Sequence, residues 1–174
     1  REGCTVRQQG VTLVQMLFAL ALLGMLTQLG VPAYSDMSAG LQRQAAATDL
    51  ARTLRTARSE ALLRNSTVQV QAMEENWSNG WRMVLEQDSQ LLHEWRRDGR
   101  ATIVGNQPVM RQVSFNGLGV PLQQGGGFQA GTLHVCQRPE AISHYQIVLS
   151  PSGRVSLREE RILHPLCAGA GSNQ

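Results

Sequence analysis

The sequence predicts an α+β protein in which one long N-terminal helix packs on an antiparallel β-sheet. The first observation behind this prediction is a charge-free stretch from Gln8 to Ser35 that leads into a segment with helical spacing of apolar residues. The second is a series of short alternating segments, separated by turn residues, in the remainder of the chain. With 174 residues, 42% of them hydrophobic, the chain is long enough for one globular domain and one anchor.

The apolar run is long enough to cross a bilayer. It includes "MLFALALLGML" at residues 16–26, and about 20 helical residues cover the roughly 30 Å hydrocarbon core. Arg1 and Arg7 precede the run and Asp36 follows it, so the positive-inside rule predicts a cytoplasmic N-terminus. Residues 11–35 are therefore predicted to form a transmembrane helix. A secretory signal cleaved after "VPA" at 31–33, leaving a soluble periplasmic protein, is the alternative.

The residues beyond that alternative cleavage site continue the helical pattern. Residues 36–66 are predicted to be an amphipathic continuation of the same helix, ending near Arg64, with Arg52 and Arg55 on its polar side. Pro32 then lies inside one element as a kink, because proline removes a helical hydrogen bond. The predicted apolar stripe consists of Ala47, Leu50, Leu54, Ala57 and Ala61.

Residues 67–174 are predicted to form a β-rich globular domain. Val68 and Val70 alternate with glutamines as in a half-buried strand, and Asn79-Gly80 marks a turn before a strand from Trp81. "SPSG" at 150–153 predicts a turn between two antiparallel strands. Further strands are predicted at 90–95, 101–104, 109–115, 132–136 and 144–150, with a glycine-rich loop at 116–127 and with Trp77, Trp81 and Trp95 as core or sheet-packing residues.

"GVTLVQML" at 10–17 resembles the class III leader junction of type IV pilins and type II secretion pseudopilins. The resemblance implies that residues 1–10 are a leader, that a prepilin peptidase cuts between Gly10 and Val11, and that Val11 becomes N-methylated. Pro32 matches the proline that kinks the long helix of the family. Two positions depart from the pattern, since Val11 stands where the family usually has phenylalanine and Gln15 where it usually has glutamate.

In the family, that glutamate is thought to neutralise the N-terminal amine of a neighbouring subunit inside the apolar filament core, where an unpaired charge is costly. Gln15 supplies no charge. Its presence resembles the tip pseudopilin, which has no subunit beyond it; a tolerated variant in a low-abundance pilin is the alternative.

"ARSEALLRN" at 57–65, with "TVQVQ" and "NGWRMVL" after it, resembles the GspH/FimT/FimU group of minor pilins and pseudopilins. The implied fold is pilin-like. The implied role is structural, in assembly of a type IV pilus or a type II secretion pseudopilus, with other major and minor pilins or pseudopilins, prepilin peptidase and the inner membrane as partners. The globular domain would lie in the bacterial periplasm, with incorporation into a pilus at the cell surface as a second implied location.

Some members of this group bind DNA during natural transformation through a G-R-x-R pattern, so a DNA-binding minor pilin is the alternative function. The nearest match is at residues 153–156, where serine replaces the second arginine. All sixteen basic residues are arginine, which suits phosphate binding but is explained more simply by codon bias. The candidate DNA-binding residues are Arg154, Arg158, Arg161, Arg96, Arg97 and Arg100, the last three near Arg111.

Cysteine usage points to export. A disulfide between Cys136 and Cys167, with Cys4 removed with the leader, is a consistent account if the domain is in an oxidising compartment. Two free buried thiols in a cytosolic protein are the alternative.

No catalytic motif is present in the sequence. The four histidines, His93, His134, His144 and His164, fit no metal-ligand spacing, and no nucleophile elbow occurs. We therefore expect no enzyme activity, no cofactor and no metal, with an uncharacterised exported enzyme as the competing interpretation.

Overall fold

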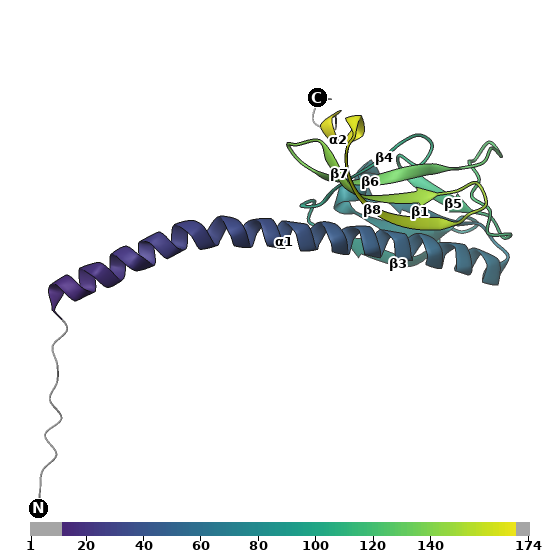
Figure 1. Cartoon of the computed structure of the whole chain (residues 1–174). Helices are drawn as coiled ribbons and strands as arrows, with labels where there is room; N and C mark the ends of the chain where they lie inside the picture. Colours follow the sequence, from purple (N-terminus) through teal and green to yellow (C-terminus); the bar gives the residue numbers. More distant parts are fainter. Residues whose placement is uncertain (1–11, 170–174) are drawn as a thin grey trace, which may run out of the picture. The chain divides into compact units, whose positions relative to one another are not determined.

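The structure is a computed structural model that describes residues 12–169, except for the side chain of residue 29. It confirms the α+β class, because one long helix precedes an all-antiparallel arrangement of strands. The chain divides into two units, with the boundary between Ser38 and Ala39. Figure 1 shows the order of the elements.

Helix α1 (Leu13–Arg64) begins close to the predicted position and continues through Pro32. Its large apolar side chains from Leu13 to Leu26 are exposed, as are those of Val31, Tyr34, Met37 and Leu41. By length and composition alone, the helix is apolar enough to cross a membrane. A cleaved signal sequence can have the same length and composition.

The later part of α1 has one buried face. All five residues of the predicted stripe, from Ala47 to Ala61, are fully buried. Alanines and leucines at this spacing let the helix approach the strands closely, because they bring no polar atom into the contact. The apolar surface that they remove from water stabilises the fold at about 25 cal/mol per Å².

The strands form two four-stranded antiparallel sheets, in the orders β3-β2-β1-β5 and β4-β6-β7-β8. Inner-face residues of both sheets and the stripe of α1 belong to one hydrophobic core. The first sheet consists of β1 (Val68–Ala72), β2 (Gly80–Leu85), β3 (Leu91–Arg96) and β5 (Gln112–Phe115), and the second of β4 (Thr102–Gly105), β6 (Gly131–Gln137), β7 (Ile142–Leu149) and β8 (Val155–Leu163).

The predicted strands agree with this arrangement to within one or two residues, except at one place. β5 begins at Gln112 rather than at residue 109, because the chain turns there: the Val109 N–H donates to the Asn106 carbonyl at 2.9 Å. Division into two sheets was not predicted. The turn at 150–153 joins β7 to β8 as expected, with Gly153 N–H donating to the Ser150 carbonyl at 2.9 Å.

Tryptophans contribute both bulk and hydrogen bonds to the core. Trp77 and Trp81 are fully buried, and Trp95 packs against the core from β3. Each buried indole N–H has an acceptor: Trp77 Nε1 donates to the Val109 carbonyl at 3.1 Å, and Trp81 Nε1 donates to Thr53 Oγ1 on α1 at 3.0 Å. The second bond fixes the register of the helix on the first sheet, because an indole N–H left unpaired there would be costly.

The predicted disulfide is present in the structure. Cys136 of β6 is bonded to Cys167 of the short helix α2 (Pro165–Gly169), with the two Cα atoms 5.4 Å apart. Loop-closure entropy for a separation of this size gives a stabilisation of about 3 to 4 kcal/mol. The bond holds the end of the chain on the second sheet.

The Thr53 to Trp81 hydrogen bond gives a direct test of the helix register. We expect Thr53→Val to lower the free energy of unfolding by about 1 to 3 kcal/mol, because it leaves the buried indole N–H without an acceptor. Chemical unfolding of the full chain in detergent, followed by tryptophan fluorescence, measures this change. Thr56→Val on the exposed side of α1 is the control, and an equal loss in both variants would contradict the assignment.

Candidate assembly and binding surfaces

The predicted cleavage and methylation positions, Gly10 and Val11, lie outside the described residues, as does Cys4. The described part starts at Thr12, which caps α1. The Gln15 N–H donates to Thr12 Oγ1 at 3.4 Å, and the Thr12 N–H donates to Gln15 Oε1 at 3.2 Å. This reciprocal pair is a capping box, readable in the sequence as T-x-x-Q. Gln15 therefore satisfies two polar groups of its own helix without a charge.

The exposed apolar part of α1 is the most unusual surface of the described chain. Large apolar side chains are exposed on every side of the helix over its first turns, among them Leu13, Leu17, Phe18 and Leu20. A helix that is apolar all round is suited to a bilayer or to the interior of an assembly rather than to water.

The predicted arginine patch at 96–100 is neutralised by neighbouring carboxylates. Arg96 pairs with Glu94 at 2.6 Å, and Arg100 pairs with Asp98 at 3.0 Å. The Arg97 side chain is only 18% exposed and points to α1, where it contacts Asp49 at 3.5 Å and lies 6.0 Å from the ring centre of Trp81. Arg111 pairs with Glu75. This surface therefore offers little uncompensated charge to a phosphate backbone.

Arg154 has a different environment, which the sequence did not reveal. It lies in the β7–β8 turn, and two arginines of α1 hold this turn and its surroundings. Arg58 donates to the carbonyls of Gly119 and Ser152 at 3.1 and 3.2 Å. Arg55 donates through Nε and Nη2 to the Val155 carbonyl at 3.3 and 3.2 Å. Helix and hairpin thus bring three guanidinium groups together.

Arg158 and Arg161, the other predicted members of this patch, lie farther along β8 and are exposed. Glu159 and Glu160 stand between them, and Tyr145 Oη donates to Glu159 Oε1 at 3.4 Å. The alternation of signs along this outer strand protects an exposed sheet edge from pairing with other chains. It does not create a continuous basic track.

The glycine-rich loop at 116–127 packs on α1 at Gly119. Gly119 and Gly153 both have positive φ, +71° and +82°, and a side chain on either residue would meet Arg58. Gly153, the glycine of the partial G-R-x-R match, is therefore required by the packing, because only glycine fits both its backbone conformation and the close approach of Arg58.

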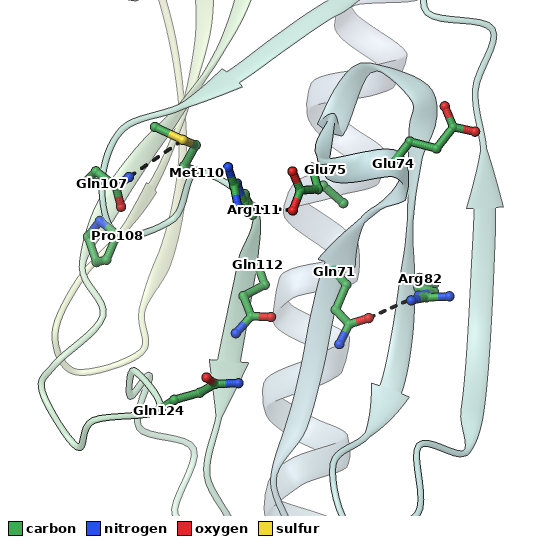
Figure 2. Close-up of a pocket in the computed structure, with 11 residues that line it drawn as sticks. Gln71, Glu74, Glu75, Arg82, Gln107, Pro108, Met110, Arg111, Gln112 and Gln124 are labelled. Carbon is green, nitrogen blue, oxygen red and sulfur yellow. Dashed lines mark hydrogen bonds and ion pairs between the residues drawn. The ribbon is translucent and has the colours of Figure 1, made fainter.

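A cavity of about 720 Å³ lies on the outer face of the first sheet, with α1 behind the sheet (Figure 2). Arg82 Nε donates to Gln71 Oε1 at 3.1 Å, and Arg111 contacts Glu75 at 3.1 Å. The lining consists largely of glutamine amides and paired charges, with no histidine, cysteine or serine. It presents a polar surface without a nucleophile or a histidine base.

Two of the four histidines meet beneath α2. The rings of His134 and His164 stack at 3.9 Å, and His134 Nδ1 lies 2.9 Å from Ser143 Oγ. Ser143 also accepts from Gln146 Nε2 at 2.7 Å. Burial, followed by repulsion from His164, lowers the pKa of His134 to about 4. Because Ser143 and His134 are both buried, they contribute to the packing of the second sheet.

His144 bonds with Gln137, and His93 packs on Trp95 at 4.2 Å. Among residues 12–169, no three histidine, cysteine or acidic side chains are placed to hold a metal ion.

We expect Gly153→Ala to destabilise the protein by about 1 to 3 kcal/mol, because the new Cβ would overlap the Gly119 carbonyl oxygen at a positive φ. Thermal unfolding of the full chain measures the effect. Gly125→Ala is the matched control, since nothing lies within 4 Å of a side chain at that position. If Gly125→Ala lowers the unfolding temperature as much as Gly153→Ala does, the close approach of the two turns is wrong.

The buried histidine predicts a loss of stability in mild acid. An unfolded histidine titrates near 6.5, whereas His134 in the folded protein titrates at about 4. The unfolded chain therefore takes up this proton first as the pH falls. The stabilisation is complete above pH 6.5 and is lost between 6.5 and 4, by about 2 to 3 kcal/mol. Denaturant unfolding at several pH values tests this; the same slope in His134→Asn would contradict it.

Comparison with known proteins agrees with these features. The family model described as type II transport protein GspH matches residues 46–153, well over half of the chain. A search of the curated proteins found no match.

Two crystal structures of the type IV minor pilin FimU from Pseudomonas aeruginosa are similar in fold, at 20% and 22% identity and a TM-score of 0.56 each. They cover 72% and 71% of this chain, and 95% and 98% of their own. This family and fold are those of structural proteins rather than enzymes. The chain belongs to the GspH family of minor pilins and pseudopilins.

Proposed function

We propose that the chain is a membrane-anchored minor pilin or pseudopilin that contributes structurally to assembly of a type IV pilus or a type II secretion pseudopilus. The observation that carries the proposal is α1 itself, which is apolar and exposed in its first part and contributes one face to the domain core in its second. Family membership implies interaction with other pilins or pseudopilins.

The energetic argument concerns where the first part of α1 is buried. Each large apolar side chain that leaves water contributes about 1.5 to 3 kcal/mol. A bilayer and the apolar interior of a filament both accept the same surface, so a subunit transfers between them with little change in apolar burial. The segment from residue 13 to 35 would be about 35 Å long, enough to span the hydrocarbon core.

The proposed processing follows the leader junction. Prepilin peptidase would cut between Gly10 and Val11 and methylate Val11, leaving residues 11–35 as the anchor, 36–66 as the continuation of the helix and 67–174 as the periplasmic domain. The Cys136–Cys167 disulfide supports an oxidising compartment for that domain.

Gln15 has a defined place in this proposal. Because its amide completes the capping box with Thr12, the helix start needs no partner from another subunit. A neutral side chain also offers no charge to the amine of a following subunit. This favours a rare subunit or one near the tip over an abundant one in the filament body.

The second candidate function is that of a DNA-binding minor pilin in DNA uptake. The observation in its favour is that Arg154 stands beside Arg55 and Arg58, so the partial G-R-x-R match gains charge from α1. The paired state of Arg96 and Arg100 speaks against a larger binding track.

Processing is tested by mass spectrometry of the mature N-terminus in cells with and without prepilin peptidase. We expect N-methylated Val11 only when the peptidase is present, and full-length chain in cells that lack it. Gly10→Val should block cleavage, while the matched change Gly24→Val inside the apolar run should leave it intact. A mature protein starting at Tyr34 in both strains would show a discarded signal and contradict the proposal.

A further inference from the structure

A groove of about 320 Å³ lies between the C-terminal part of α1 and the β7–β8 hairpin, entirely within the unit that begins at Ala39. Helix α1 contributes two arginines, a serine and a leucine, and the hairpin contributes a third arginine beside Val155. The lining residues are Arg55, Arg58, Ser59, Leu62, Gly153, Arg154 and Val155.

Among residues 12–169, no acidic side chain neutralises the positive charge of the three arginines in the groove. Five other arginines pair with carboxylates elsewhere in the domain, but within residues 12–169 none of these three has an acidic partner within 4.0 Å. Arg55 and Arg58 donate only to main-chain carbonyls. Carbonyl oxygens fix the orientation of a guanidinium but carry no net charge to neutralise it, so the groove attracts anions.

The groove also has an apolar rim. Leu62 is 50% exposed, and Leu118, in the turn that packs on it, is 75% exposed. A side chain on Gly119 would meet Leu62 at 3.1 Å, which places this turn directly on the helix. The exposed leucines favour a ligand that covers apolar area, and the unpaired arginines beside them favour a ligand with a negative charge.

We propose that this groove binds a segment of a neighbouring filament subunit that carries a carboxylate side chain beside an apolar one. The inference rests on the proposed function, because it assumes that the chain assembles with other subunits. A carboxylate fits the guanidinium groups bidentately, and an apolar neighbour covers the leucines. The α1 arginines are already oriented by main-chain carbonyls, so binding costs little side-chain ordering.

Nucleic acid fits the same surface less well. A phosphate backbone needs an extended row of cations along its path, whereas Arg158 and Arg161 of β8 are separated by two glutamates. Leu62 and Leu118 would also remain exposed next to a charged backbone. The combination of charge and apolar rim therefore favours a protein partner.

The test measures binding between the full chain in detergent micelles and each purified subunit of the filament system of its own host. Arg154→Glu is the main variant, because the structure gives its side chain no hydrogen bond that the fold depends on. We expect at least a tenfold loss of affinity at low salt that shrinks at high salt. Arg158→Glu on β8 is the matched control and should change affinity less than threefold.

Leu118→Ser tests the rim separately, with an expected loss of several-fold that does not depend on salt. Unchanged affinity in both Arg154→Glu and Leu118→Ser, with binding otherwise intact, would overturn the groove and leave the proposed function standing. If the wild-type chain binds none of the subunits, the proposed function and this inference both fail.

A labelled duplex oligonucleotide is measured with the same variants. If Arg154→Glu abolishes its binding and leaves subunit binding unchanged, nucleic acid is the ligand and the inference is wrong.

Discussion

The fold depends on a single helix that has to satisfy two different surroundings. In its later part, the stripe from Ala47 to Ala61 forms the core together with both sheets. In its first part, apolar side chains are exposed all round. Apolar surface of this extent is unstable in water, and a bilayer or the interior of an assembly would bury it. The later part of α1 thus stabilises the domain, while its first part leaves apolar surface for another environment to cover.

Arginines take a structural role in attaching the domain to this helix. Arg58 reaches two turns, at Gly119 and Ser152, and Arg55 reaches the start of β8. Arg97 reaches back from the end of β3 to Asp49. A guanidinium can donate several hydrogen bonds at fixed angles, which suits it to join loops whose carbonyls would otherwise be unpaired. The use of arginine throughout the chain therefore has a structural consequence whatever its genetic origin.

Much of this fold could be predicted from local patterns, because periodicity and turn residues act over a few positions. The helical stripe, most strands and the turn at 150–153 are of this kind. The disulfide joins residues 31 positions apart and was predicted from cysteine usage instead. The partition into two sheets depends on contacts between distant segments and left no local signal. For the same reason, the sequence placed Arg97 on a surface and gave no hint that Arg55 and Arg58 meet the hairpin. The Thr12 and Gln15 cap, in contrast, was readable from its spacing.

The two parts of α1 also treat charge in opposite ways, and this difference limits how subunits can recognise one another. From Leu13 to Ser35 the helix has no charged side chain, and the polar ends of Gln15, Thr27 and Ser35 are satisfied within the helix. Packing of such a surface is nearly non-directional, because the hydrophobic effect depends on area rather than on orientation. Charged side chains begin at Asp36, and arginines held in fixed positions, such as Arg55 and Arg58, lie in the globular domain. We therefore expect directional recognition between subunits to depend on the globular domain more than on the apolar segment.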